Sequence, residues 1–303
     1  MKKWIQAFRL RTLPLSFSTI LAGNALAYLF WFDQFKSIVL WLTLLTTLFL
    51  QILSNLANDY GDASKGADNE NRIGPQRAIQ SGAISAKKMK AAIFIFVFLS
   101  LISGLALLFL AFENFNLTYI VFTLIGILAI AAAIKYTMGK GAYGYSGLGD
   151  VFVFVFFGLV GVCGSYYLQT GEINLWSVAL AVSIGCFSTA VLNLNNMRDI
   201  ENDKAVGKNT LVVRLGAVRA KRYHVLLFIF AWFAFPLHAL IFFDSYYFLI
   251  LFLPLPLHAL HLIKVSHVQK PAEFDPELKK IALSSFLFSA LLWLTVYFLD
   301  VSQ

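Results

Sequence analysis

Charged residues are scarce in this sequence. Asp, Glu, Lys and Arg together make up 13% of its 303 residues, whereas hydrophobic residues make up 59% and aromatic residues 16%. Soluble globular domains carry about 25% charged residues, so this composition excludes a water-soluble globule. We therefore interpret the chain as an integral membrane protein.

Cysteine is rarer still, and histidine lies outside the polar clusters described below. Cys163 and Cys186 both fall within apolar runs, where a small thiol packs well against other side chains. This placement argues against a disulfide framework, a cysteine metal centre and thiol redox chemistry. Of the five histidines, we interpret His238 and His258 as packed or interfacial residues.

What the sequence does contain is a series of long apolar runs. Each is roughly 17 to 22 residues long, enough for a helix to cross a hydrocarbon core of about 30 Å. The runs are too continuously apolar for barrel strands, which alternate polar and apolar residues. The sequence therefore predicts an all-α membrane protein with nine transmembrane helices, at Ser16–Phe32, Ser37–Ala57, Ala91–Phe112, Leu117–Ile134, Val151–Leu168, Leu175–Leu194, Val225–Phe243, Tyr246–Ile263 and Ile281–Leu299.

Basic residues are distributed unevenly between the two ends of these spans. All but one of the 24 Lys and Arg residues lie before the first span or in the second, fourth, sixth and eighth connections, and Lys36 is the exception. Because positive side chains remain on the cytoplasmic side, the N-terminus is predicted to be cytoplasmic and the C-terminus external. The net charge of +8 follows from this bias and requires no nucleic acid as a partner.

The long connections also lie on the predicted cytoplasmic side, at about residues 58–90, 135–149 and 196–224. Long loops on a rigid scaffold commonly carry function. The sequence offers no separate soluble domain for that role, so we interpret residues 1–303 as a single integral-membrane domain. Its active site is predicted where these loops meet the helix bundle.

The second span ends in a polar cluster, NLANDYGD at residues 55–62. Asn55, Asp59 and Asp62 are spaced four and three residues apart, which places them on one face of a helix. The following loop adds another carboxylate, Asp68, and three cations, Lys65, Arg72 and Arg77.

The sixth span ends in a second cluster of the same kind, within NLNNMRDIENDKAVGKNTLVVRLG. Asp199 and Asp203 are four residues apart, and Asn195 and Asn196 precede them by one helical turn. Four basic residues surround them: Arg198, Lys204, Lys208 and Arg214. Two helix ends on the same predicted side of the membrane thus carry the same chemistry.

Carboxylates at the C-terminal ends of helices face the unfavourable pole of the helix dipole, and they also repel each other. Ordinary interfacial capping leaves both costs unexplained, whereas a bound divalent cation resolves both. Oxygen ligands without His or Cys favour Mg²⁺ over zinc, and protein-bound Mg²⁺ commonly shares its remaining positions with substrate phosphate. We therefore predict a lipid diphosphate as substrate, with its phosphates held by Arg72, Arg77, Arg198, Lys204 and Lys208.

Three stretches of the chain together resemble the signatures of the UbiA superfamily of intramembrane aromatic prenyltransferases. They are NDYGDxxxGxD followed by GPQRAI, then KYTMGKGAYGYSGLGDVFVFVFFG (Lys135–Gly158), and NNMRDxxxDxxxGKNTL. RLRTLPLSF near the N-terminus also fits, so the resemblance covers about Arg9 to Gly216. Within the superfamily the combination is most similar to the menaquinone-pathway branch, which prenylates 1,4-dihydroxy-2-naphthoate.

The resemblance implies Mg²⁺-dependent transfer of a polyprenyl group from polyprenyl diphosphate to 1,4-dihydroxy-2-naphthoate, with loss of CO₂ and diphosphate, giving demethylmenaquinone. Two Mg²⁺ ions are implied, one at Asn55, Asp59 and Asp62 and one at Asp199 and Asp203. Asp68 matches the third acidic position of the first signature, and Asn195 completes the predicted ligand set. Besides the four aspartates Asp59, Asp62, Asp199 and Asp203, the resemblance implies catalytic roles for Tyr136, facing the allylic cation, and Lys140, holding diphosphate.

The two acidic signatures, four spans apart, also suggest an internal duplication around one central cavity. A cavity open sideways to the bilayer would let a long prenyl tail remain in membrane lipid. The expected location is the cell inner membrane, with the active site on the cytoplasmic side.

Alternatives remain at this stage. The acceptor could be 4-hydroxybenzoate or another quinone precursor, and a transporter would use similar polar residues as ion ligands on a translocation path. The clusters lie at one membrane surface rather than at the midplane, which favours the enzyme. The sequence leaves open the prenyl chain length, the oligomeric state, which aromatic residues line the cavity and the role of Asp150.

Overall fold

The structure is a computed structural model that describes residues 2–301 except 71, 113 and 244. Within these residues every regular element is helical, and nine helices are long and apolar enough to cross a membrane. The predicted all-α, nine-span architecture is therefore confirmed. The outermost residues of the predicted single domain, 1 and 302–303, lie outside the described residues.

The nine spans of the described residues consist of one to three helical elements each. In chain order they are α1 (Lys2–Phe8), η1 (Leu10–Thr12) and α2 (Leu13–Phe30); α3 (Ser37–Ser64); α4 (Ala86–Ala111); α5 (Leu117–Lys135); α6 (Gly149–Val153), the π-helix η4 (Phe154–Cys163) and α7 (Gly164–Thr170); α8 (Leu175–Arg198); α11 (Ala217–Trp232), the π-helix η5 (Phe233–Leu237) and α12 (His238–Phe242); η6 (Tyr246–Phe252) and α13 (Leu255–His267); and η7 (Pro271–Glu273) with α14 (Phe274–Val301). Short elements in the connections are η2 (Phe32–Gln34), η3 (Tyr143–Tyr145), α9 (Ile200–Ala205) and α10 (Leu211–Leu215).

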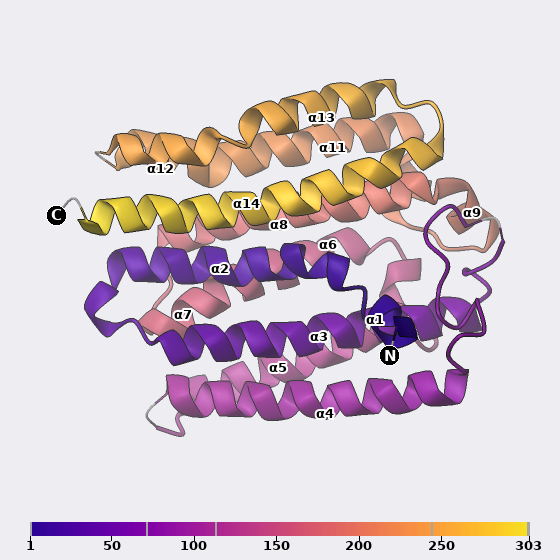
Figure 1. Cartoon of the computed structure of the whole chain (residues 1–303), viewed down its shortest axis with the longest axis horizontal. Helices are drawn as coiled ribbons and strands as arrows, with labels where there is room; N and C mark the ends of the chain where they lie inside the picture. The colour runs from indigo at the N-terminus through magenta and orange to yellow at the C-terminus, as the bar shows by residue number, and fades with distance from the viewer. Residues whose placement is uncertain (1, 71, 113, 244, 302–303) are drawn as a thin grey trace.

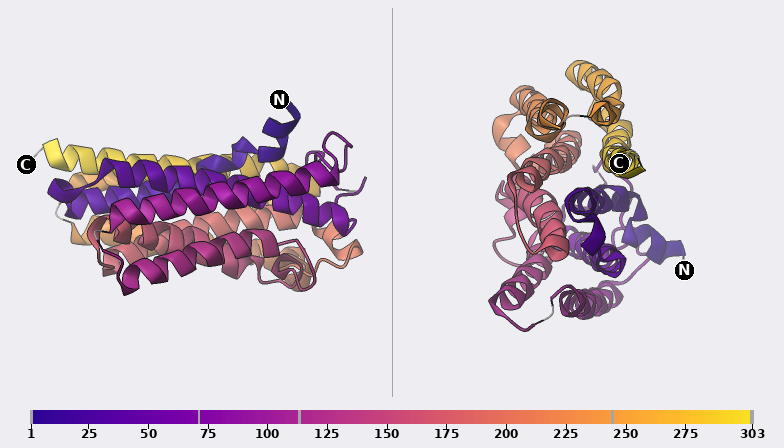
Figure 2. Two further views of the ribbon diagram at one scale, coloured as in Figure 1. Left: turned by 90° about the horizontal axis from the view of Figure 1, so that it is seen from below. Right: turned by 90° about the vertical axis from the view of Figure 1, so that its left-hand side faces the viewer.

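The spans run side by side along one axis, and α3 and α8 both finish at the end of the bundle where α9 lies (Figure 1). We call this end the acidic end, because it carries Asp59, Asp62, Asp199 and Asp203. The N-terminal helix α1 also lies there, whereas the C-terminus lies at the opposite end (Figure 1). Viewed along the axis, α11 to α13 lie on one side of the bundle and α3 to α5 on the other (Figure 2).

Several helices extend beyond their predicted bounds near the acidic end, α3 and the first span among them. The apolar run predicted the second span to end at Ala57, but α3 continues to Ser64, so Asp59 and Asp62 are helical residues. The first span was predicted to begin at Ser16, but α2 begins at Leu13, with Pro14 in its first turn. With α1 and η1 included, the span begins at Lys2, and the chain turns at Arg9 (φ 49°) before α2 begins. Hydropathy detects the apolar middle of a helix and misses polar turns that continue it.

Close helix packing in the middle of the bundle depends on glycine. A Cβ atom on Gly158 in η4 would lie 2.6 Å from the Ala181 carbonyl oxygen and 2.9 Å from the Gly185 Cα atom in α8. No larger residue fits between these two backbones. The contact holds η4 against α8, and this π-helix forms part of the wall of the central cavity.

That cavity has a volume of about 1390 Å³ and extends along the bundle. Arg9, Asp62 and Lys208 line it at the acidic end, and Leu117 and Ile173 line it at the opposite end. Its wall between these ends is mainly apolar, with hydroxyl and amide side chains along α2 and α3: Ser16, Thr19, Thr43, Thr46, Thr47, Gln51 and Ser54. The prediction of helices around a central cavity is confirmed.

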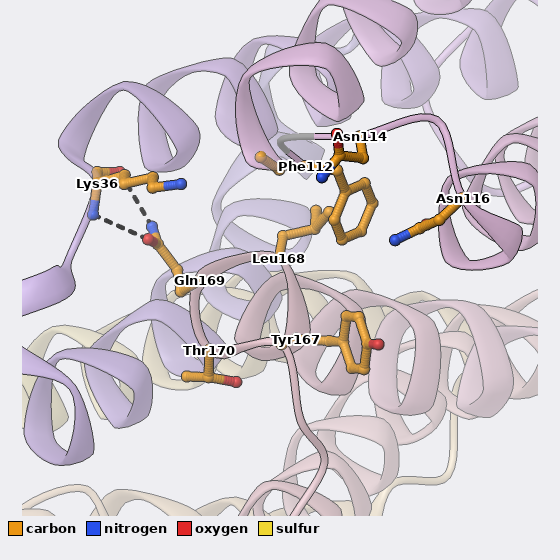
Figure 3. Close-up of a pocket in the computed structure, with 10 residues that line it drawn as sticks. Lys36, Phe112, Asn114, Asn116, Tyr167, Leu168, Gln169 and Thr170 are labelled. Carbon is orange, nitrogen blue, oxygen red and sulfur yellow. Dashed lines mark hydrogen bonds between the residues drawn. The ribbon is translucent and has the colours of Figure 1, made fainter.

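A smaller polar pocket of about 320 Å³ lies at the opposite end (Figure 3). The Gln169 side chain bridges the backbone of Lys36 there, accepting from its N–H at 3.0 Å and donating to its carbonyl at 3.1 Å (Figure 3). Asn114, Asn116 and Tyr167 contribute to its lining. None of the predicted site residues lines this pocket, so the site must be sought at the acidic end.

Candidate active site

The first acidic cluster is formed by the last turns of α3 and the loop that follows. Asp59 and Asp62 are 1% and 5% exposed. Asp59 accepts hydrogen bonds from the backbone N–H groups of Ala78 and Ile79, at 3.0 and 3.3 Å. It therefore fixes the returning loop against α3. Asp62 accepts a hydrogen bond from the Tyr145 hydroxyl at 2.9 Å.

Asp68 lies in the same loop and is surrounded by guanidinium groups. Its Oδ1 atom is 3.3 Å from Arg72 Nε and 3.5 Å from Arg77 Nε, yet neither carboxylate oxygen accepts a hydrogen bond from the described residues. Burial and the nearby Asp62 carboxylate raise the pKa of Asp68 to about 7. Asp68 Oδ1 is therefore ion-paired with two guanidinium groups, although neither of its oxygens accepts a hydrogen bond, and a metal ion could bind there only if those groups moved away.

The second cluster is formed by the end of α8 and by α9. Arg198 donates from Nη2 and Nε to the two carboxylate oxygens of Asp199, at 2.7 and 3.0 Å. Its Nη1 donates to Asp275 Oδ1 at 2.6 Å, and its Nη2 also donates to Asn195 Oδ1 at 2.9 Å. Four of the five N–H groups of the predicted diphosphate ligand Arg198 thus donate to protein oxygens.

Asp203 has one free oxygen in this cluster. Lys208 Nζ lies 3.5 Å from its Oδ1, whereas Oδ2 is buried and has no hydrogen-bond partner among the described residues. Burial, opposed by the Lys208 charge, raises the pKa of Asp203 to about 6, and the carboxylates of Asp199 and Asp62 add to the rise.

The two clusters, about 130 residues apart in sequence, meet as one site. Arg72 Nη2 lies 4.0 Å from Asp199 Oδ2, and the Asn202 side chain donates to the Ala67 carbonyl at 3.0 Å. Five of the predicted site residues line the cavity where the clusters meet: Asp62, Arg77, Asn195, Arg198 and Lys208.

The donor set fits Mg²⁺ in its chemistry. In the described part of the chain, no three carboxylate, imidazole or thiol groups converge closely enough to hold a metal ion as they stand. Instead, basic side chains lie between the carboxylates. The ligands are nevertheless oxygens, and Asp68 and Asp203 keep buried oxygens without a hydrogen-bond donor. A bound diphosphate would attract those basic side chains away from the carboxylates and leave them to the metal.

Asn55, a predicted metal ligand, makes hydrogen bonds to protein groups in this structure. Its Nδ2 donates to the Phe8 carbonyl at 2.9 Å and to Thr12 Oγ1 at 3.0 Å, and its Oδ1 accepts from Gln51 at 3.4 Å. The side chain therefore ties the N-terminal segment to α3.

The structure brings Tyr136 to the cavity but not Lys140 or Lys204. The Tyr136 ring packs against Gly144 and Gly149, where added Cβ atoms would lie 3.0 and 3.3 Å from the ring. Lys140 stands between two glycines of positive φ, Gly139 and Gly141, in an exposed turn. Lys140 and Lys204 are both exposed and absent from the cavity lining.

Three residues at the site were not identified from sequence. Arg9 lines the cavity and keeps a buried Nη2 atom without a hydrogen-bond partner among the described residues; the N-terminal RLRTLPLSF stretch was a signal for it. Tyr145 binds Asp62, and its place in the signature stretch Lys135–Gly158 could have marked it. Asp275 binds Arg198 from a part of the chain that carries no signature.

Aromatic rings continue from this site into the cavity. Tyr143 stacks on Phe152 with ring centroids 3.9 Å apart and meets Tyr136 edge-on at 5.3 Å, while Phe156 stacks on Phe152 at 6.1 Å. All four rings line the cavity. The negative faces of such rings stabilise a nearby cation, and sequence alone could not show which aromatic residues take this position.

The fold and site together define a multi-pass membrane protein with an oxygen-rich polar site at one end of a long, mainly apolar cavity. Residues 16–286 match the UbiA prenyltransferase family. The chain belongs to this family, as its three signatures predicted.

Similar proteins extend this result. A 1,4-dihydroxy-2-naphthoate octaprenyltransferase of Haemophilus influenzae is 47% identical over 96% of this chain and 94% of its own length. The protein of the same name in Escherichia coli is 50% identical over 74% of this chain and 72% of its own. A solved UbiA homolog from Archaeoglobus fulgidus, bound to GPP and Mg²⁺, covers 97% of this chain and 99% of that one, with a TM-score of 0.65 and 16% identity. At that identity the likeness concerns the fold.

Proposed function

We propose that this protein transfers a polyprenyl group from polyprenyl diphosphate to 1,4-dihydroxy-2-naphthoate, releasing CO₂ and diphosphate and giving demethylmenaquinone. The observation that carries the proposal is the junction of the two acidic clusters with the 1390 Å³ cavity. One end suits a diphosphate and the other a long hydrocarbon tail. The names of the Haemophilus influenzae and Escherichia coli relatives support the naphthoate as acceptor.

Bound Mg²⁺, as two ions, would neutralise the diphosphate and make it a better leaving group. Asp59, Asp62 and Asp68 would hold one ion, and Asp199 and Asp203 the other. Arg72, Arg77 and Lys208 now neutralise these carboxylates. On substrate binding, their charges would turn to the diphosphate oxygens, where negative charge develops as the C–O bond breaks.

The remaining residues determine what surrounds the allylic carbon. The aromatic rings of Tyr136, Tyr143 and Phe152 line the cavity beside the acidic clusters, where their π electrons would stabilise the developing cation. The apolar wall beyond them excludes water, which would otherwise capture that cation before the aromatic acceptor attacks it.

We place the acidic end at the cytoplasmic face of the cell inner membrane, because nearly all Lys and Arg residues lie in the connections at that end. Residues 1–303 then act as one membrane domain.

Aspartate substitutions test the proposal. Asp62→Asn and Asp203→Asn, each purified in detergent and supplied with polyprenyl diphosphate, the naphthoate and Mg²⁺, should lower the turnover rate by about 10²-fold or more. Asp33→Asn is the matched control, because Asp33 is exposed at the opposite end. Full turnover in both site variants, or in EDTA, would refute the metal chemistry. Prenyl diphosphate flux across vesicles without product would favour a transporter.

A further inference from the structure

Tyr145 connects the two acidic clusters although it does not line the cavity. It lies in η3, in the connection between the fourth and fifth spans. Its hydroxyl donates to Asp62 Oδ1 at 2.9 Å, and its carbonyl accepts from the backbone N–H of Asn209 at 3.1 Å. One residue thus contacts the end of α3 and the segment that follows α9.

The Tyr145 ring also holds two cations. Lys65 Nζ lies 4.0 Å from its centroid and Lys208 Nζ lies 5.5 Å from it. Both distances are within the range of about 6 Å for a cation–π interaction. The ring therefore keeps two mutually repelling ammonium groups beside Asp62 and Asp203.

The hydroxyl contact restricts the orientation of Asp62. A tyrosine hydroxyl donates a single hydrogen bond, so Oδ1 is held by Tyr145 while Oδ2 faces Arg77 Nη2 at 3.8 Å. Hydrogen bonds of this kind orient metal-binding carboxylates.

We propose that Tyr145 is a positioning residue with two separable parts: its hydroxyl orients Asp62 toward a divalent cation, and its ring holds Lys208 where a diphosphate would meet it. The inference rests on the proposed function. It assigns the affinity for the metal ion to the Tyr145 hydroxyl and the affinity for the prenyl diphosphate to the Tyr145 ring. The substitutions Y145F and Y145L therefore separate the two roles.

The test uses the full-length protein in detergent and Mn²⁺ as the probe, with binding measured by electron paramagnetic resonance in the presence of prenyl diphosphate and without aromatic acceptor, because the basic side chains leave the carboxylates only when a diphosphate is bound. Y145F should weaken Mn²⁺ binding by about tenfold, the lower end of effects on groups that orient metal ligands. Its KM for the prenyl diphosphate at saturating Mg²⁺ should stay near the wild-type value. Y145L should weaken Mn²⁺ binding equally and also raise that KM by roughly threefold to tenfold.

Y166F is the matched control, because Tyr166 also makes one hydroxyl hydrogen bond, accepting from Asn174 at 2.7 Å at the opposite end. It should leave both quantities unchanged. If the wild-type protein binds no Mn²⁺, the proposed metal chemistry fails. If the wild-type protein and Y145F bind Mn²⁺ equally, the inference about Tyr145 fails while the function stands. A fall in the thermal stability of Y145F with unchanged Mn²⁺ binding would also refute the inference about Tyr145. If Y145L does not fold, Y145F still tests the role of the hydroxyl.

Discussion

Gly61, between Asp59 and Asp62 in α3, is the point where the signature stretch Lys135–Gly158 packs against the first acidic signature. A Cβ atom there would overlap Thr137 Oγ1 and lie 2.7 Å from the Thr137 carbonyl carbon. Thr137 is fully buried, and its hydroxyl donates to the Ala57 carbonyl at 3.1 Å. Because one of the overlapping atoms belongs to the backbone, a change of rotamer cannot relieve the overlap.

The magnitude follows from two opposing effects of Gly61→Ala. Overpacking of a well-packed site costs about 1–3 kcal/mol, and the higher helix propensity of alanine returns up to about 1 kcal/mol. We therefore expect a net loss of up to about 2 kcal/mol in the free energy of unfolding. The connection after α5 must also move away from α3 and carries Tyr136 and Tyr145 with it. A displacement of about 1 Å at an active site can cost 10²-fold in rate.

The assay measures thermal unfolding of Gly61→Ala in detergent against that of Gly126→Ala, and its initial rate of prenyl transfer against that of the wild-type protein, because Gly126 lines the cavity. Gly126 lies inside α5 and has no atom within 4 Å of an added Cβ, so its substitution should be neutral or stabilise the helix by up to about 1 kcal/mol. A Gly61→Ala protein with wild-type unfolding temperature and wild-type rate would refute the packing argument.

Two further predictions concern the basic residues. Asp275→Asn should raise the Mg²⁺ concentration for half-maximal rate severalfold, because Asp275 holds Arg198, which orients Asp199. The control is Glu273→Gln, since Glu273 is exposed in the preceding turn. Equal Mg²⁺ curves for the two variants would contradict the prediction. Lys208→Ala should raise the KM for prenyl diphosphate by roughly tenfold more than Lys140→Ala, because the buried Lys208 lines the cavity while Lys140 is exposed. Equal KM values for these two lysine variants would show that the loop of Lys140 closes onto the substrate.

Much of the fold could be predicted because membrane spans are defined by length and hydropathy, properties that a short segment carries by itself. The convergence of the two acidic clusters could also be predicted, since both follow spans that end on the same side. The turn at Arg9 could not be predicted. Hydropathy ended the second span at Ala57, and only the spacing of Asn55, Asp59 and Asp62 indicated that the helix continues, because polar helical turns look like loop in a hydropathy pattern.

Side-chain partners within the site were harder to predict from the sequence. Arg198 was interpreted as a diphosphate ligand because it adjoins Asp199, but its guanidinium is held by Asp275, 77 residues further along the chain. The role of Lys140 was implied by the family resemblance, and a motif match does not show that the glycine-flanked turn is exposed. The aromatic wall was hidden among 30 Phe residues, most of which are equally suited to face lipid.

The central claim is most directly tested by a competition assay. The purified protein is given a polyprenyl diphosphate and Mg²⁺, with 1,4-dihydroxy-2-naphthoate and 4-hydroxybenzoate offered together, and the products are identified by mass spectrometry. We predict a prenylated, decarboxylated naphthoquinol that is lost in EDTA. Prenylated hydroxybenzoate as the main product would contradict the assigned acceptor, and no prenylated product from either acceptor would contradict the proposed reaction.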